Sequence, residues 1–325
     1  MRILVTGGSG YVGSHAVREL VEAGYEVLIY DNLSTGRRRL SAGYELVEGD
    51  ISDCAKLAPL LSRVDAVMHF AASAYVGESV ENPRKYFHNN VESGLSLLDA
   101  VLSSQVRIFV FSSTCAVYGV PERLPIHETS VVKPINPYGA TKLFFEQVLE
   151  AYGVSHNLRY VALRYFNAAG AHPSGLVGEM HNPETHLIPL SLKAVLGGAP
   201  PLRVFGNDFD TPDGTCIRDY VHVSDLASAH VLALQYLLDG GQPAILNLGT
   251  GRGTSVKEII SSFHELTGLT VPHEFAPRRP GDPPCLYACP TKARRLIGWA
   301  AKHTLTDILR SAWEWERQMY AGGGV

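Results

Sequence analysis

Three glycines near the N-terminus constrain the fold more than any other feature of this sequence. Gly7, Gly10 and Gly13 follow a G-x-x-G-x-x-G spacing, directly after a β-branched segment over 2–6 and at the start of a helical pattern over 11–23. In a strand–turn–helix unit, the first glycine permits a tight turn, the second lets the backbone approach a pyrophosphate, and the third lets helix and strand pack closely. The N-terminus of the helix also offers free N–H groups to phosphate oxygens. The segment therefore predicts a dinucleotide-binding loop.

An acidic residue follows this loop at the distance that such loops require. Asp31 comes directly after the second predicted strand, 26–30. A carboxylate there can bind both ribose hydroxyls and would repel a 2′-phosphate, so the pair favours NAD over NADP. Asp50 and Ile51, after the third predicted strand, either flank the adenine or form an ordinary turn.

Short apolar segments alternate with helical patterns through the first half of the chain. Strands spaced by helices predict βαβ units and a parallel sheet that is buried on both faces. Two longer helices are predicted over 82–104 and 137–153. The expected strands cover residues 2–6, 26–30, 44–48, 66–70, 107–111 and 160–164. The predicted fold class is therefore α/β, with a Rossmann-type, doubly wound parallel sheet.

The character of the sequence changes after Tyr165, where glycine and proline become frequent. Frequent glycine and proline are typical of loops around short strands and helices. A length of 325 residues accommodates one large domain or two ordinary ones. We expect an NAD-binding domain over 1–165 and a smaller α/β substrate domain over 166–325. Residues from about 219 to 247 are a candidate for return to the first domain.

Composition excludes several classes of protein. The net charge of -4 and the pI near 6.3 argue against a dedicated nucleic-acid binder. No apolar run approaches the ~18 residues of a membrane span, and the first apolar run is too short for a signal peptide. The five cysteines lack a CxxC pairing, which indicates reduced thiols and a cytoplasmic protein. Cys285 and Cys289 have no second pair nearby, so no metal site is predicted.

A tyrosine and a lysine stand four residues apart at the start of the second long helix. Tyr138 and Lys142 therefore lie on one helical face, and Pro137 suits the first helical position. An ammonium group beside a phenol stabilises the phenolate and lowers its pKa, as acid–base catalysis requires. The spacing alone is common, but beside a dinucleotide loop it indicates an active site.

With these residues in place, the sequence resembles the extended short-chain dehydrogenase/reductase family. Within that family it is most similar to the NAD-dependent UDP-sugar 4-epimerases, in particular those that act on UDP-glucose and UDP-galactose. The resemblance covers nearly the whole chain. The motifs that carry it are 5–15 (VTGGSGYVGSH), 31–33 (DNL), 69–72 (HFAA), 76–79 (VGES), 89–90 (NN), 111–114 (FSST), 117–119 (VYG), 163–167 (LRYFN), 170–175 (GAHPSG), 205–208 (FGND), 213–220 (DGTCIRDY), 247–249 (NLG) and 278–282 (RRPGD).

The resemblance implies a role for each matching position. Tyr138 would be the acid/base at the sugar 4-hydroxyl, Lys142 would hold the nicotinamide ribose, and Thr114 would hydrogen-bond the 4-hydroxyl. The implied cofactor positions are Gly7, Gly10, Tyr11, Val12, Gly13, Asp31, Asn32, Leu33, Asp50, Ile51, Phe70, Ala71, Ala72, Asn89, Ser112, Tyr138, Lys142 and Phe166. The implied positions for the uridine diphosphate sugar are Thr114, Tyr138, Asn167, Leu187, Phe205, Arg218, Arg279, Asp282 and Leu286.

The implied reaction inverts C4 of a UDP-hexose through a transient 4-keto sugar, with one hydride passing to NAD and returning to the other face. Because NAD is regenerated in each cycle, we expect it to be held tightly. The two arginines, Arg218 and Arg279, suit a diphosphate, although either alone also fits a surface ion pair.

Neighbouring activities in the same fold remain as alternatives. A nucleotide-sugar dehydratase would carry Asp-Glu directly after Thr114, where this chain has Cys115 and Ala116. A simple alcohol dehydrogenase would exchange its cofactor, and the uridine motifs argue against it. A non-catalytic NAD-sensing protein would have a broken Tyr/Lys/Thr set, which is complete here.

Two departures from the family pattern affect the expected sites, the first at the cofactor and the second at the substrate. Ala74 stands where some 4-epimerases carry a lysine near the cofactor phosphates. Leu286 occupies the position that gates the sugar C2 substituent; it either admits N-acetylated hexoses or only packs the loop. Segments 113–116 and 134–138 also resemble those of UDP-arabinose/xylose 4-epimerases, so a pentose substrate stays open. By analogy, the two long helices are expected to pair with a second subunit in a homodimer.

Overall fold

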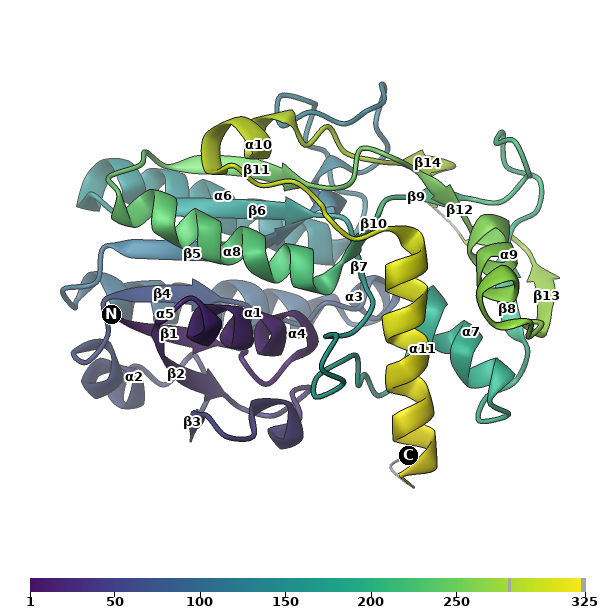
Figure 1. The fold of residues 1–325 in the computed structure, drawn as a ribbon. Helices are drawn as coiled ribbons and strands as arrows, with labels where there is room; N and C mark the ends of the chain where they lie inside the picture. The colour runs from purple at the N-terminus through teal and green to yellow at the C-terminus, as the bar shows by residue number, and fades with distance from the viewer. Residues whose placement is uncertain (280–281, 323–325) are drawn as a thin grey trace.

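The fold is built around a parallel sheet of seven strands in the order β11-β6-β5-β4-β1-β2-β3 (Figure 1). The computed structural model describes residues 1–279 and 282–322, so Pro280 and Gly281 of the 278–282 motif and the final glycines 323–324 lie outside the described residues. The strands are β1 (Arg2–Thr6), β2 (Glu26–Asp31), β3 (Glu45–Glu48), β4 (Ala66–His69), β5 (Ile108–Thr114), β6 (Arg159–Tyr165) and β11 (Ala244–Leu248). The predicted Rossmann-type α/β sheet is confirmed, and β11 adds a seventh strand that the sequence did not reveal.

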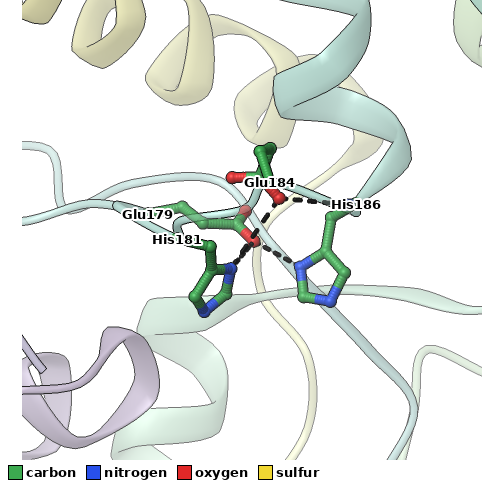
Figure 2. A group of neighbouring side chains, drawn as sticks. All are labelled: Glu179, His181, Glu184 and His186. Atoms are coloured by element: carbon green, nitrogen blue, oxygen red, sulfur yellow. Dashed lines mark hydrogen bonds and ion pairs between the residues drawn. The ribbon is translucent and has the colours of Figure 1, made fainter. Parts of the chain in front are cut away.

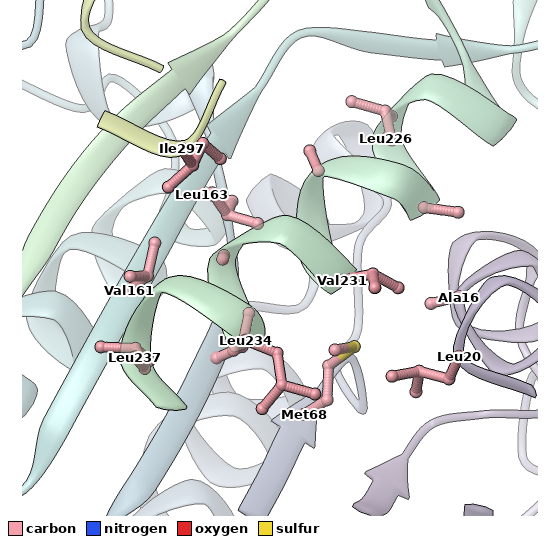
Figure 3. Packing of buried hydrophobic residues seen from close by; sticks show 14 of the residues in the cluster. Ala16, Leu20, Met68, Val161, Leu163, Leu226, Val231, Leu234, Leu237 and Ile297 are labelled. Carbon is pink, nitrogen blue, oxygen red and sulfur yellow. The ribbon is translucent and has the colours of Figure 1, made fainter. Parts of the chain in front are cut away.

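Helices cover both faces of the sheet. On one face lie α1 (Tyr11–Glu22) and α8 (Val223–Leu238), whose apolar side chains pack on β4 and β6 (Figure 3). Leu20, Leu226 and Leu234 are fully buried there, each contributing about 1.5–3 kcal/mol relative to exposure. On the other face lie α2 (Cys54–Leu61), α5 (Ser93–Leu102) and α6 (Pro137–His156). Burial on both faces explains the nearly continuous apolar runs of the strands.

The segment predicted as one helix over 82–104 is interrupted. It consists of α4 (Pro83–Tyr86), a π-helical turn η2 (Phe87–Glu92) and α5, and it follows α3 (Val76–Glu81). The side chain of Asn90, in the turn, donates to Ser73 O at 3.0 Å and to Thr141 Oγ1 at 3.1 Å. The bond to Thr141 ties the turn to α6 and the bond to Ser73 ties it to the loop after β4. Hydrophobic periodicity does not report such tertiary contacts.

The second long helix begins as predicted but extends further. Asn136 caps α6, because its side chain accepts a hydrogen bond from Gly139 N at 2.8 Å. The helix continues past the predicted end at 153 to His156, where Asn157 adopts a left-handed conformation with φ 54°.

Most of the remaining elements form a smaller region beside the carboxyl ends of the sheet strands (Figure 1). Its core lies among α7, α9 and α11. The elements are β7 (Asn167–Ala169), α7 (Leu187–Val195), β8 (Leu202–Phe205), β9 (Ile217–Arg218), β10 (Tyr220–His222), β12 (Thr254–Ser255), α9 (Val256–Thr267), β13 (His273–Ala276), β14 (Cys285–Leu286) and α11 (Leu305–Ala321). Helix α10 (Thr291–Ile297) instead packs on α8 and β11 of the main sheet. The 3-10 turns η1 (Arg38–Ser41) and η3 (Cys115–Tyr118) lie in the first half of the chain. Within the described residues, no helix is long and apolar enough to cross a membrane.

Candidate active site

The phosphate loop has the backbone geometry that its glycines predict. Gly7 has φ +74°, and a Cβ there would collide with the backbone of Ala71; a Cβ on Gly13 would collide with Gly7 O. A Cβ on Gly10 would meet only Gly7 O, at 3.3 Å, among the described residues. Gly10 precedes α1 and provides no side-chain cap, so the first N–H groups of the helix are available to an anion. The loop fits a pyrophosphate.

Asp31 lies against this loop. Its two oxygens accept hydrogen bonds from Ser9 N at 2.9 Å and Leu33 N at 2.8 Å. Burial raises the pKa of this carboxyl, and the two backbone donors oppose the rise. The neighbouring Asn32 donates to Asp50 Oδ2 at 2.8 Å, which brings the ends of β2 and β3 together.

The other predicted cofactor positions surround the same edge of the sheet. Phe70 N and Ala71 N donate to Thr6 O at 2.9 and 3.1 Å, just after β4. Tyr11 OH donates to Gly170 O at 2.5 Å. Ile51 is buried after β3, Val12 is in the first turn of α1, Ala72 follows β4, Asn89 is in η2, Ser112 is in β5 and Phe166 follows β6.

The tyrosine, lysine and threonine lie between the end of β5 and the start of α6. Lys142 Nζ donates to Ser112 O at 2.8 Å, two residues before Thr114 on β5. Tyr138 is only 7% exposed, and its hydroxyl hydrogen-bonds to Thr114. Thr114 Oγ1 also accepts from Ala116 N at 3.2 Å, which fixes the turn after β5.

Burial sets the protonation of this group. Burial raises the pKa of Tyr138, Tyr165 adds to the rise, and the hydrogen bond from Thr114 opposes it. Burial lowers the pKa of Lys142 to about 7, and the charge of Glu146 opposes that shift. A proton on Lys142 is thus exchangeable near neutral pH, which is the range in which acid–base chemistry operates.

A buried ion pair beneath Lys142 is part of this site that the sequence analysis missed. Arg164 on β6 makes a bidentate bond to Glu146 on α6, with Nη2 to Oε2 at 2.5 Å and Nε to Oε1 at 3.0 Å. Ser113 also donates to Glu146, at 2.5 Å. Glu146 stands four residues after Lys142, so continuing the four-residue spacing along the helix would have found it.

A second group of predicted residues gathers in the smaller region. Asp282 accepts from Arg218 Nη2 at 2.5 Å on one oxygen and from Arg279 Nη2 at 3.1 Å on the other. The guanidinium of Arg279 lies 4.9 Å from the ring centre of Phe205. Arg218 is buried, whereas the side chain of Arg279 is 57% exposed. The acid thus aligns two cations that each retain donors for phosphate oxygens.

An apolar cluster connects the two groups. Leu286 on β14 pairs with Arg218 on β9, and it packs in one cluster with Phe166 and with Cys115, the residue after Thr114. Burial raises the pKa of the Cys115 thiol to about 12, while the charge of Arg218 opposes this rise. Leu187 begins α7, and Asn167 N bonds to Asp219 O at 2.9 Å in β7.

A further set of polar side chains was not predicted. Glu179, His181, Glu184 and His186 come together in the loop before α7 (Figure 2). His181 Nδ1 is 2.8 Å from Glu179 Oε1, and His186 Nδ1 also contacts that oxygen. Burial alone would raise the pKa of Glu179, but the two imidazoles lower it to about 2. Four ligand-type residues within eight positions were a signal available in the sequence.

Comparisons with known proteins agree with this geometry. The profile of the NAD dependent epimerase/dehydratase family matches residues 3–249. The chain belongs to the NAD-dependent epimerase/dehydratase family. Within this family, the chain is 52% identical over 322 residues to a UDP-glucose 4-epimerase of Azospirillum brasilense, covering 98% of this chain and 92% of that protein.

Solved structures of this family superpose over almost the entire chain. The crystal structure of UDP-glucose 4-epimerase from Brucella ovis in complex with NAD has a TM-score of 0.94 and 52% identity, covering 96% of this chain and 97% of that one. The UDP-glucose 4-epimerase from Stenotrophomonas maltophila, with bound NAD and formylated UDP-arabinopyranose, has a TM-score of 0.96 and 43% identity, covering 99% of both chains.

Proposed function

We propose that this protein is an NAD-dependent UDP-sugar 4-epimerase that interconverts UDP-glucose and UDP-galactose. The observation that carries the proposal is the arrangement of Tyr138, Lys142 and Thr114 at the end of β5, joined through the Cys115 and Leu286 packing to the arginine pair. The close similarity to UDP-glucose 4-epimerases, including the NAD complex from Brucella ovis, supports it.

The residues present fit NAD. Side chains at Gly7 and Gly13 would collide with the backbone, the helix start has no side-chain cap, and the Asp31 carboxylate would oppose a 2′-phosphate. When bound, NAD would take hydride from C4 of the sugar and return it. The remaining proposed cofactor positions, from Asn32 to Phe166, line the same edge of the sheet.

The chain's own residues would supply proton transfer and orientation. Because burial raises the pKa of Tyr138, its phenolate would depend on cationic groups beside it. In that form Tyr138 would take the proton of the 4-hydroxyl and give it back, with Thr114 hydrogen-bonded to the same oxygen. Lys142 would stabilise the phenolate and hold the nicotinamide ribose. Proton transfer by a positioned side chain contributes about 10²–10⁴-fold to the rate.

The second group of residues would hold the uridine diphosphate sugar. Arg218 and Arg279 would bind the diphosphate, with Asp282 keeping both in place. Asn167, Leu187, Phe205 and Leu286 complete the proposed substrate set. We propose that residues 1–165 form the NAD-binding domain and 166–325 the substrate domain, and the pairing of β11 with β6 and the packing of α8 on the sheet support a return of about 219–247 to the first.

A dehydratase is the nearest alternative chemistry, and the turn after Thr114 disfavours it. Removal of water across C5 and C6 needs an additional acid and base. Cys115 has a pKa raised to about 12 by burial and stays protonated, and the methyl group of Ala116 carries no proton to exchange. These two positions therefore provide neither the acid nor the base that elimination of water requires.

The range of UDP-sugars that the protein accepts is a separate question. Leu286 is smaller than a tyrosine would be, which favours some acceptance of N-acetylated hexoses. The Stenotrophomonas relative was solved with a UDP-pentose derivative, which keeps UDP-arabinose among the candidates.

We also propose a cytoplasmic homodimer. The five cysteines are free, as in a reducing compartment. Phe87 in η2 and Phe144 in α6 are 43% and 42% exposed on neighbouring helices, which suits pairing with a second copy. Light scattering after size-exclusion chromatography measures the mass directly.

One assay tests the proposed reaction. Purified protein, without added NAD, is given UDP-galactose, UDP-N-acetylgalactosamine or UDP-arabinose, and products are followed by NMR. We expect UDP-glucose from UDP-galactose, and NAD released on denaturation. If NAD is bound but none of the three sugars is interconverted, the proposal is wrong; a 4-keto-6-deoxy product would indicate the dehydratase.

A further inference from the structure

Four side chains suited to metal binding converge in the loop between β7 and α7. Glu179, His181, Glu184 and His186 each direct one oxygen or nitrogen toward a common point, and these atoms lie within 4.8 Å of one another (Figure 2). Donors on a tetrahedral ion with bonds of about 2.0–2.2 Å stand roughly 3.3–3.6 Å apart. Modest side-chain rotations would therefore place all four donors on one ion.

His181 contributes a buried ring nitrogen to this cluster. Its Nδ1 lies 2.8 Å from Glu179 Oε1 and 3.8 Å from Glu184 Oε1. Within the described residues, however, this buried nitrogen forms no hydrogen bond of acceptable angle. A protonated Nδ1 donates a hydrogen bond only to an acceptor that lies along its single N–H direction. A cation between the groups would engage the imidazole lone pair and both carboxylates together.

Glu184 provides an independent observation. Its side chain is 5% exposed, and its Oε1, which is turned toward His181, accepts from the backbone N–H groups of Thr185 and His186 at 2.8 and 2.9 Å. Its Oε2 has no hydrogen-bond partner across residues 1–279 and 282–322, and Lys193 Nζ lies 4.0 Å away. A buried carboxylate with an unpartnered oxygen is costly, and a cation held on its other oxygen, Oε1, would offset part of the charge of the carboxylate.

We propose that Glu179, His181, Glu184 and His186 bind one divalent transition-metal ion of the zinc class. Two imidazoles with two carboxylates match the N/O donor set and coordination number of Zn²⁺, whereas Ca²⁺ and Mg²⁺ prefer oxygen donors alone. The indole N–H of Trp315 donates to Glu179 O at 2.9 Å, which anchors the loop from α11.

The proposed ion is structural, since none of its four ligands belongs to the proposed catalytic set. It would fasten the loop that leads into α7, immediately before Leu187. The site stands independently of the proposed reaction, because its test measures metal binding and not turnover.

The test uses the full-length protein, stripped with EDTA and dialysed into metal-free buffer at pH 7.5. ZnCl₂ is titrated by calorimetry, and CoCl₂ by visible absorption. We expect one saturable ion per chain, a higher melting temperature with Zn²⁺, and a tetrahedral Co²⁺ spectrum without thiolate charge-transfer bands. Thiolate bands, or no saturable binding by the wild-type chain, would overturn the proposal.

Variants locate the ion. His181→Gln and Glu184→Gln keep side-chain size, and each should weaken Zn²⁺ binding by at least about 10–100-fold, the cost of disturbing even an outer partner of a metal ligand. His264→Gln, on α9, is the matched control and should bind as wild type. Circular dichroism verifies that each variant is folded. Equal affinity in His181→Gln, Glu184→Gln and wild type would place the ion elsewhere and refute the site.

Discussion

At the scale of single residues, the hydroxyl of Tyr138 has the most direct proposed role. Tyr138→Phe removes one oxygen from a buried position that hydrogen-bonds Thr114. We expect the epimerase rate to fall by about 10²–10⁴-fold, the usual contribution of a positioned acid/base. NMR of UDP-galactose conversion measures the rate, and the NAD released on denaturation should be unchanged.

A control for this change lies on the same helix. Tyr152 is partly buried against His156, away from the site, so Tyr152→Phe should keep the wild-type rate. If Tyr138→Phe were as active as Tyr152→Phe, the proton would have to move through another group.

The residues that the sequence predicted best are those whose role is local. Gly7 needs a positive φ for its own turn, a Cβ on Gly13 would collide with the backbone of Gly7, and Asp31 bonds to Ser9 in the same βαβ unit. The meeting of Arg218 with Asp282 spans 64 positions. Only the family resemblance pointed to it, because no local pattern reports such a contact.

At the scale of elements, one face of α6 carries both the proposed catalytic residues and a residue of a buried ion pair. Tyr138, Lys142 and Glu146 recur every four residues on that face, and Glu146 is bonded to Arg164 in β6. Glu146→Gln leaves the buried guanidinium unbalanced and should cost about 3–5 kcal/mol of unfolding free energy. Urea denaturation followed by circular dichroism measures this loss.

The same helix provides the comparison. Glu150 is exposed, so Glu150→Gln should change the unfolding free energy little. Adding Arg164→Met to Glu146→Gln should recover part of the loss, because the isolated charge is then removed. A Glu146→Gln variant as stable as Glu150→Gln would mean that the pair contributes nothing to folding.

Elements were predicted where their periodicity is strong and missed where tertiary contacts decide. The first strands and α1 agree closely with their patterns, since both faces of the sheet are buried. The π-helical turn η2 depends on Asn90 bonding to Ser73 and Thr141. The two-residue strands β9, β12 and β14 form only by pairing between segments that are far apart in the sequence. A short stretch of sequence therefore does not predict them.

At the scale of the whole molecule, buried histidines determine the response to acid. Burial lowers the pKa of His15 and of His69 to about 3, and that of His230 to about 4, from an ordinary 6.5. The unfolded chain therefore binds more protons below pH 6.5, and stability falls as the pH drops toward these folded values. Each imidazole costs about 1.4 kcal/mol for every pH unit in that window.

Urea denaturation at pH 7 and pH 5 checks this expectation. The unfolding free energy should be lower at pH 5 by several kcal/mol for the wild type, on the order of the sum of these contributions. His230→Leu should show a smaller difference, while His264→Gln, at an exposed position, should match the wild type. An equal unfolding free energy at both pH values would contradict the assignment of buried neutral imidazoles.

The buried carboxylate of Asp219 has a consequence for the order in which the chain can be completed. Its oxygens accept from Thr250 N at 2.8 Å, Gly251 N at 3.2 Å and Ala288 N at 3.1 Å. Strands β1 to β6 can pair as they leave the ribosome, because each joins segments already made. The substrate side closes only after residue 288 has been synthesised. A nascent chain of this protein can thus pair strands β1 to β6 of its nucleotide fold well before it can assemble its sugar site.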